Sequence, residues 1–424
     1  MIGANFLSGA GGRLLPPSIP FRYFTVGVIF YVVFWAALFV SADDLTSYTK
    51  GGGPILSVIH MATLGVLSMT VIGASLQLLS VATRKAFKGF WLCRLVSWFY
   101  IPGIFLITYA MYISWHSGML MGAGLTGGGL LIFCGLIIHN IWGVTGMAAI
   151  MAHCWAAMLS LMGLLGLGIL LIVNAEHGFM PDHFALATSH FILAVFGFMT
   201  LLAMGFSYIL IPMFALSPGP PEGLGRWSIG CNITGLIGIL IGVNIYLDWL
   251  VIAGIGFIFS GVGLYIYAMT RVYKARMRKR LGLPFILIRI SWVMLLISVI
   301  WGAVGAAGYW PDRGHTLFAA AAIGWLLTFL MGVLQRIIPF LASMHSSGHG
   351  GVPLLTSAMA DERLLTVNVL GHLAGLSAVI LGIMFDWDMV IRAGAVMGFA
   401  GAMGLLIYLM YIIRHLASFR GEKA

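Results

Sequence analysis

The chain has 424 residues, of which 61% are hydrophobic and only 8% are charged. This composition excludes a soluble globular protein, since a soluble surface needs many more charged side chains. The formal net charge of +10 is explained by basic loops that anchor membrane helices and contact anionic lipid, and it does not indicate nucleic-acid binding.

Apolar stretches of about 20 residues or more follow one another along the whole chain, and each can span a bilayer. Backbone polar groups in lipid must be satisfied within their own segment, so we expect helices. The fold class predicted is therefore all-α, a polytopic membrane bundle of about twelve transmembrane helices. The predicted spans are roughly 22–41, 55–80, 90–113, 121–141, 144–173, 184–214, 228–247, 249–270, 284–307, 315–341, 364–385 and 389–413.

The basic residues predict the orientation of these spans. Most Lys and Arg residues, including the run RVYKARMRKR at 271–280, fall on the side that would also hold both termini. Acidic residues such as Asp43, Asp182 and Asp248 fall on the other side. The excess of Lys and Arg marks the cytoplasmic side. We therefore expect both termini inside, in the bacterial inner (cytoplasmic) membrane, with the lipid bilayer as the surrounding partner.

A pattern recurs in the second, sixth and tenth predicted spans. Each carries a histidine near its outer end and then a glycine (Gly73, Gly205 or Gly332), followed seven residues later by Ser80, Pro212 or Pro339. The glycines are about 130 positions apart, the length of four membrane helices. The chain is thus interpreted as a single integral membrane domain of three pseudo-repeats, about 20–141, 144–270 and 284–413. The two prolines are expected to end their helices.

Four histidines are expected to cluster in the outer part of the membrane: His60, His183, His190 and His315. Imidazoles inside membrane helices are costly and usually functional. Histidines on facing helices with an apolar slot between them are what a b-type haem needs, so these four are the candidate cofactor ligands. A membrane histidine can instead hydrogen-bond a neighbouring Ser, Thr or carbonyl, and that alternative stays open.

A second group lies toward the cytoplasmic side. His139, His153 and His372 have matching predicted depths, so they could share a metal or a second haem. Methionines near His153 in sequence would suit copper, which makes copper a possible cofactor. The four cysteines form no C-x-x-C pair, so neither a disulfide framework nor a thiolate zinc site is predicted.

What the spans lack also bears on function. No acidic residue falls in the middle of any predicted span. Proton pumps and secondary transporters usually keep carboxylates inside the membrane, so proton pumping is not expected.

Twelve spans, three four-helix repeats and outer histidines on spans 2, 6 and 10 resemble subunit I of the haem-copper oxidase and nitric oxide reductase superfamily. The resemblance implies a low-spin haem held by His60 and His315, with His190 or His183 contributing from span 6. The seventh span, GCNITGLIGILIGVNIYL, has no histidine, although that superfamily places a metal-binding pair there. A complete oxygen-reducing centre is therefore not expected.

The opening PFRYFTVGVIFYVVFWAALFV, followed by HMATLGVLSMTVIGASLQLL, resembles the first two helices of the NnrS-type haem- and copper-containing membrane proteins. The acidic residue that follows the histidine in that family's signature is missing between Met61 and Leu64. This resemblance implies electron transfer or nitric oxide handling. Whether the protein is an enzyme is left open.

Two other functions remain in view. The protein could be a non-catalytic membrane subunit that anchors a larger respiratory complex, with a redox partner or other subunits around it. It could also be a transporter for a metal or another small solute, with Met and His as soft ligands.

Overall fold

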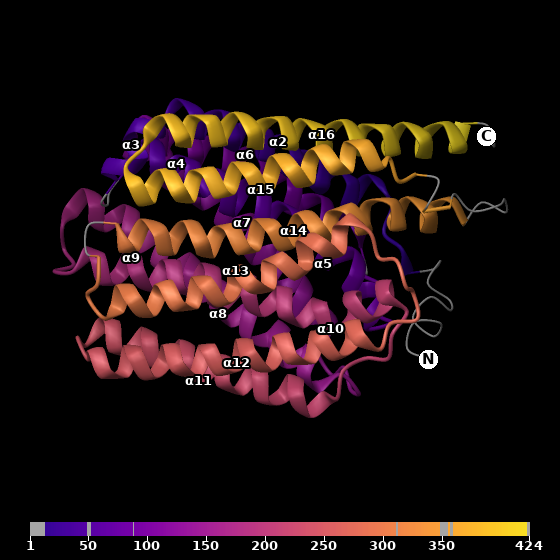
Figure 1. Ribbon diagram of the computed structural model, residues 1–424, viewed down its shortest axis with the longest axis horizontal. Helices are drawn as coiled ribbons and strands as arrows, with labels where there is room; N and C mark the ends of the chain where they lie inside the picture. The colour runs from indigo at the N-terminus through magenta and orange to yellow at the C-terminus, as the bar shows by residue number, and fades with distance from the viewer. Residues whose placement is uncertain are drawn as a thin grey trace.

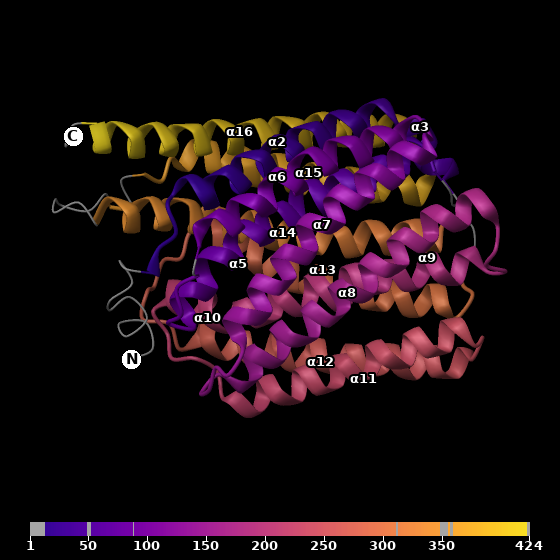
Figure 2. The same ribbon diagram turned by 180° about the vertical axis from the view of Figure 1, so that it is seen from behind.

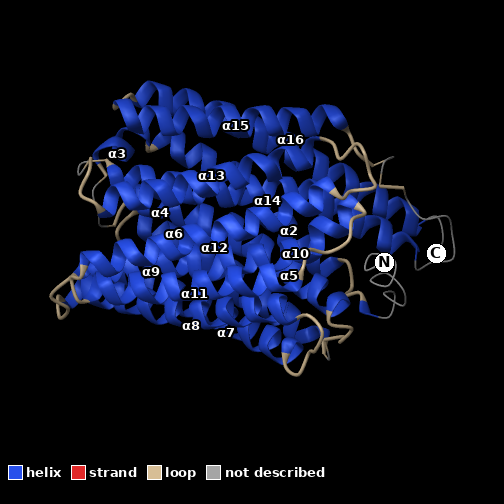
Figure 3. Cartoon of the chain, turned by 60° about the horizontal axis from the view of Figure 1, so that its bottom comes forward, coloured by secondary structure: helices blue, strands red, loops and turns tan. Residues whose placement is uncertain are grey.

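The structure, a computed structural model, describes residues 13–48, 52–87, 89–310, 313–347, 355–356 and 359–421. In these residues regular structure is entirely helical, with loops at the two ends of the bundle (Figure 3). The helices are α2 (Ser18–Val40), α3 (Ala42–Ser47), α4 (Pro54–His60), the π-helical η2 (Met61–Ser68), α5 (Met69–Ala82), α6 (Phe90–Tyr112), α7 (His116–Ile141), α8 (Ala148–His177), α9 (His183–Ile192), the π-helical η3 (Leu193–Thr200), α10 (Leu201–Ala215), α11 (Glu222–Asn244), α12 (Asp248–Lys274), α13 (Leu283–Ala306), α14 (Gly314–Ser347), α15 (Glu362–Phe385) and α16 (Asp388–Gly421).

Twelve helical stretches in these ranges are long and apolar enough to cross a membrane. The predicted all-α polytopic membrane bundle is therefore confirmed. Helices α4, η2 and α5 form one continuous span, Pro54–Ala82, and α9, η3 and α10 form another, His183–Ala215. We call these the second and sixth spans, and α14 the tenth.

One predicted helix end was wrong. Helix α14 continues through Pro339 to Ser347, although the proline was expected to end it. A proline removes one N–H from the helix, but neighbouring helices and local adjustment make this tolerable in a membrane span. Pro212 also lies inside its helix, three residues before the end of α10 at Ala215.

The spans run side by side, and α2 begins at the same end of the bundle where α16 finishes (Figures 1 and 2). We call the end of the bundle where α2 begins and α16 finishes the terminal end, and the opposite end the distal end. The basic residues predict that the distal end is the outer side. Helix α16 packs against α2, so the first and last spans close the bundle. The second, sixth and tenth spans are the most buried, at 61%, 78% and 83% of their apolar windows, and they form its centre.

The three recurring glycines each sit where the preceding span crosses. A Cβ at Gly73 would lie 2.7 Å from the Cβ of Tyr23 on α2, and one at Gly205 would lie 2.8 Å from the Cβ of His153 on α8. At Gly332 it would lie 2.7 Å from the carbonyl oxygen of Pro284 on α13. Small residues permit such close approach of membrane helices. The recurring glycine is thus explained by packing, and the three pseudo-repeats stay a prediction.

Candidate functional site

A cavity of about 980 Å³ lies inside the bundle. It extends from loop residues at the distal end, including Tyr48, Ser114 and Tyr246, to Ser68 and Leu326 within the spans. Its volume is at the upper end of the range for small-molecule sites, roughly 300–1,000 Å³. Among the described residues that line it, Asp248 is the only one with a formal charge. The cavity therefore suits a large, mostly apolar ligand.

All four histidines predicted to bind a cofactor line this cavity: His60, His183, His190 and His315. A fifth lining histidine, His116, was predicted to lie in a loop. It is instead the first residue of α7, because that helix begins five residues earlier than its apolar run. The apolar run was the only signal for the helix start, and it could not reveal the polar first turn.

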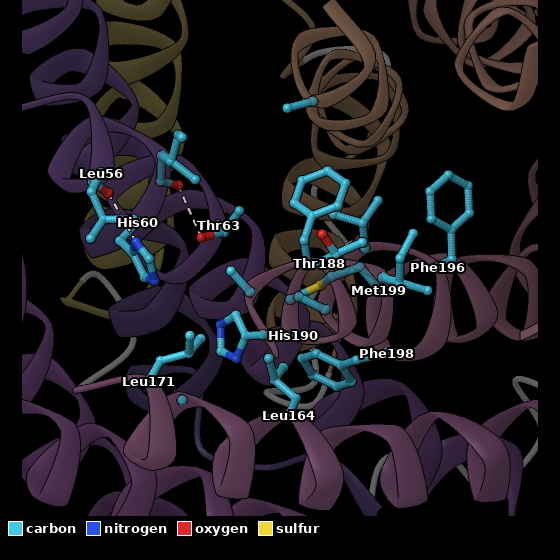
Figure 4. A pocket seen from close by; sticks show the side chains of 18 of the residues that line it. Leu56, His60, Thr63, Leu164, Leu171, Thr188, His190, Phe196, Phe198 and Met199 are labelled. Atoms are coloured by element: carbon cyan, nitrogen blue, oxygen red, sulfur yellow. Dashed lines mark hydrogen bonds between the residues drawn. The ribbon is translucent and has the colours of Figure 1, made fainter. Parts of the chain in front are cut away.

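His60 lies at the end of α4 and is held in one orientation (Figure 4). Its Nδ1 is 2.9 Å from the carbonyl oxygen of Leu56, one turn earlier. A carbonyl only accepts, so Nδ1 carries the proton and donates. The Nε2 atom is then left with a free lone pair. A hydrogen bond on one ring nitrogen that prepares the other for a metal is the usual arrangement of a ligating histidine.

His190, on α9, lies across the cavity from His60 (Figure 4). The two ring centroids are 6.5 Å apart and the ring planes are inclined by 30°. An imidazole nitrogen binds a metal at about 2 Å and lies about 1.1 Å from its own ring centre, so two rings on opposite sides of one ion have centres roughly 6 Å apart. The observed spacing therefore fits two axial ligands of one metal.

The His190 ring is oriented by contacts with α8. Its buried Nδ1 interacts with the backbone of Leu164, without the full geometry of a hydrogen bond. The ring packs against Gly168 of α8, where an added Cβ would lie 3.1 Å from the Cε1 atom of His190. These contacts leave Nε2 as the nitrogen available to the cavity.

A π-helical segment follows each of these two histidines. Segment η2 begins directly after His60, and η3 begins three residues after His190. Side-chain hydroxyls satisfy carbonyls of the widened turns: the Tyr100 hydroxyl donates to the Leu64 carbonyl at 3.1 Å, and Ser68 donates to the Thr63 carbonyl at 2.9 Å. Single π-helical turns are frequent at functional sites. No such segment occurs in α14, the span that carries His315.

His183 has a different role from His60. The Nδ2 atom of Asn174 lies 3.1 Å from the Nδ1 atom of His183. The Oδ1 atom of Asn174 accepts from the Met180 amide at 2.6 Å. The second bond fixes the amide, so Nδ2 donates to His183 Nδ1. The proton of a neutral His183 is then on Nε2. This histidine offers the cavity a hydrogen-bond donor in place of a lone pair for a metal.

The start of α9 is fastened at the rim of the cavity. Asp182 caps the helix by accepting from the Ala185 amide at 2.9 Å, and it also accepts from the Tyr246 hydroxyl at 2.8 Å. The hydrogen bond to the Asp182 carboxylate raises the pKa of the Tyr246 phenol above its ordinary value. This contact links the α11–α12 loop to the helix that carries His183 and His190.

His315 is exposed and lies near the start of α14. Its ring meets the Phe184 ring edge-on, with centroids 5.3 Å apart. The ring facing His60 is that of His190, although the resemblance had implied His315 for this position.

The histidines of the terminal half do not form a comparable site. His372 is buried, with Tyr31 Oη 2.7 Å from Nδ1 and Thr328 Oγ1 2.9 Å from Nε2. His153 donates to the Ala149 carbonyl at 2.7 Å, and His139 is exposed near the end of α7. The described part of the chain contains no group of three His, Cys, Asp or Glu side chains placed to hold a metal ion. The shared metal of His139, His153 and His372 stays a prediction, and both nitrogens of His372 are already engaged.

Gly168→Leu should disturb the His190 ring. The new side chain begins 3.1 Å from the Cε1 atom of His190, so the imidazole must move. We expect a cofactor bound through His190 to lose affinity by about 10- to 100-fold, as when a group that orients a ligand is removed. Cofactor content per folded protein measures this loss. Gly166→Leu is the matched control, because an added Cβ there meets no described atom within 4 Å and Gly166 does not line the cavity.

No model of a known protein family matches the chain, and no curated protein matches it. The resemblance to haem-copper oxidases and to NnrS-type proteins therefore stays a prediction. The case for a function rests on the geometry of the cavity.

Proposed function

We propose that this membrane protein binds a b-type haem between His60 and His190 and serves in electron transfer or nitric oxide handling. The observation that carries the proposal is the pair of rings facing each other at 6.5 Å across a large apolar cavity. His60 keeps an Nε2 lone pair, and the His190 ring faces it across the cavity; two imidazoles so placed are what a bis-imidazole site requires. Copper is not part of this proposal, because the described residues contain no group of three His, Cys, Asp or Glu side chains placed to hold a metal ion.

The residues of the cavity fit this group. The apolar walls suit a porphyrin face, and the packed helices would exclude water, which helps to set the redox potential of a bound haem. His183 Nε2–H, near the distal end, would give a donor to a carboxylate of such a group. When bound, a haem with two imidazole ligands supplies reversible one-electron chemistry.

The proposal is tested with the purified protein in mild detergent. We expect a reduced-minus-oxidised absorbance spectrum with the sharp bands of a low-spin b-type haem, and about one iron per chain by elemental analysis. The same preparation should respond to nitric oxide with a change in these bands. Absence of haem bands from protein expressed with excess haem, together with absence of iron, would refute the proposal.

A further inference from the structure

Helix α7 carries two sets of glycines, and only one has a packing reason. A Cβ at Gly122 would lie 2.6 Å from the Ile107 backbone nitrogen on α6, and one at Gly129 would lie 3.0 Å from that of Tyr100. These glycines allow α6 and α7 to touch. At Gly124, by contrast, an added Cβ meets no described atom within 4 Å, and at Gly127 it meets only Leu165 Cδ2, at 4.0 Å.

The second set borders the cavity. Gly124, Gly127, Gly128 and Leu131 recur at intervals of three and four along α7, and so do Leu165, Gly168 and Ile169 along α8. Such spacing puts each group on one helix face. Helices α7 and α8 lie side by side (Figure 2). We call the space bounded by these seven residues the slot. Along α7 it is about 10 Å long at 1.5 Å per residue.

Within the membrane, the exposed part of the cavity lining is at the slot. Leu131 and Ile169 line the cavity and yet are 52% and 45% exposed, and Gly124 is exposed as well. Every other exposed lining residue lies in a loop or within two residues of the distal end of a span: Gly52, Ser114, Ala175, Phe184, Tyr246, Asp248, Ala306 and His315. The exposed residues of the cavity lining thus fall in two places, the distal end of the bundle and the slot.

We propose that the slot is a lateral entrance through which a lipid-soluble ligand with a hydrocarbon chain enters the cavity from the bilayer. The slot is lined by glycine and aliphatic side chains alone, so it favours hydrocarbon over any polar solute. Its length matches a chain, whereas a diatomic gas needs no such groove. It leads to Gly168, against which the His190 ring lies. The proposal does not require the haem.

The test uses light-activated labelling in nanodiscs. A free long-chain alkyl diazirine is added to the bilayer, and labelled residues are identified by peptide mass spectrometry. In the wild type we expect label on Trp301 and Phe318, which line the cavity on the side of α13 and α14, and on Phe105, which is exposed on α6. The double variant Gly124→Leu with Gly127→Leu fills the slot without a backbone clash. It should lower label on Trp301 and Phe318 on the order of tenfold and leave Phe105 unchanged.

Matched controls separate filling of the slot from the general effect of adding a leucine side chain to these helices. Gly135→Leu on α7 and Gly166→Leu on α8 add the same side chain where no described atom lies within 4 Å of a new Cβ and outside the cavity lining. Both should label like the wild type. A short water-soluble diazirine should reach the cavity through the distal end of the bundle equally in all variants.

Undiminished cavity labelling in the filled variant would overturn the proposal, as would a parallel loss with the water-soluble probe. Labelling only by a diazirine carried on a phospholipid chain would also overturn it, since the occupant would then be a structural lipid. Haem content, measured on the same samples, tests the proposed function separately.

Discussion

His60→Ala and His190→Ala are each expected to abolish the low-spin haem spectrum, while His315→Ala retains it. The two rings that face each other at 6.5 Å belong to His60 and His190, and each would supply one axial nitrogen. Removing a direct ligand should cost more than the 10- to 100-fold loss of affinity that follows removal of a supporting group, hence more than about 100-fold. The measurement is a reduced-minus-oxidised spectrum, normalised to folded protein by size-exclusion chromatography.

Added imidazole separates a ligand role from a folding defect. In His190→Gly the vacated space should accept free imidazole, and the low-spin bands should return as its concentration rises. His183→Ala should keep the low-spin bands with a weaker affinity for haem, because its Nδ1 accepts from Asn174 and its Nε2 is a donor to a carboxylate of the group and not a metal ligand. Retention of an unaltered haem spectrum in both His60→Ala and His190→Ala would remove this ligand assignment.

His372→Ala is expected to reduce the free energy of unfolding by about 3 kcal/mol. It leaves the buried Tyr31 hydroxyl without its partner, at roughly 1–3 kcal/mol, and removes one of the two bonds of the Thr328 hydroxyl, at about 1 kcal/mol. Tyr31 of α2 and Thr328 of α14 both bond the ring, which belongs to α15. The Thr328 hydroxyl also lies 2.8 Å from the Gly324 carbonyl, to which it donates. Its oxygen therefore accepts from His372 Nε2–H, and Nδ1 accepts from Tyr31. The ring joins three helices.

Equilibrium unfolding in mixed micelles measures this loss. Tyr31→Phe and Thr328→Val each remove one of the two bonds, so each should destabilise less than His372→Ala. Haem content per folded chain should stay at the wild-type level in all three variants. A His372→Ala protein of unaltered stability that had lost a metal or haem would show instead that the ring is a ligand.

Depth along a helix could be predicted from the sequence, but the direction in which a side chain points could not. His60, His190 and His315 were expected at similar levels, and the structure places all three on one cavity. Which of them faces His60 depends on helix rotation. The π-helical segments η2 and η3 change that rotation within the second and sixth spans. Composition does not indicate a π-helix, since such a segment keeps the same apolar composition as the α-helix around it.

The same limit applies to the other histidines and to the glycines. His372 and His60 are both imidazoles in apolar helices, yet one bridges two hydroxyls and the other opens toward a cavity. Gly122 and Gly124 are two positions apart on α7, yet one meets a neighbouring backbone and the other meets empty space. The difference between the two histidines, and that between the two glycines, depends on which residues of neighbouring helices pack against each position.

The sequence by itself determined that this protein is an all-α bundle of twelve membrane spans. Hydrophobicity over about 20 residues decides whether a segment spans a bilayer, and it is a local property of the chain. Only the tertiary structure decided which imidazoles meet, where the cavity lies and which residues of its lining are exposed between α7 and α8. These features arise from contacts between spans far apart in sequence, whose geometry is set by close packing at particular glycines.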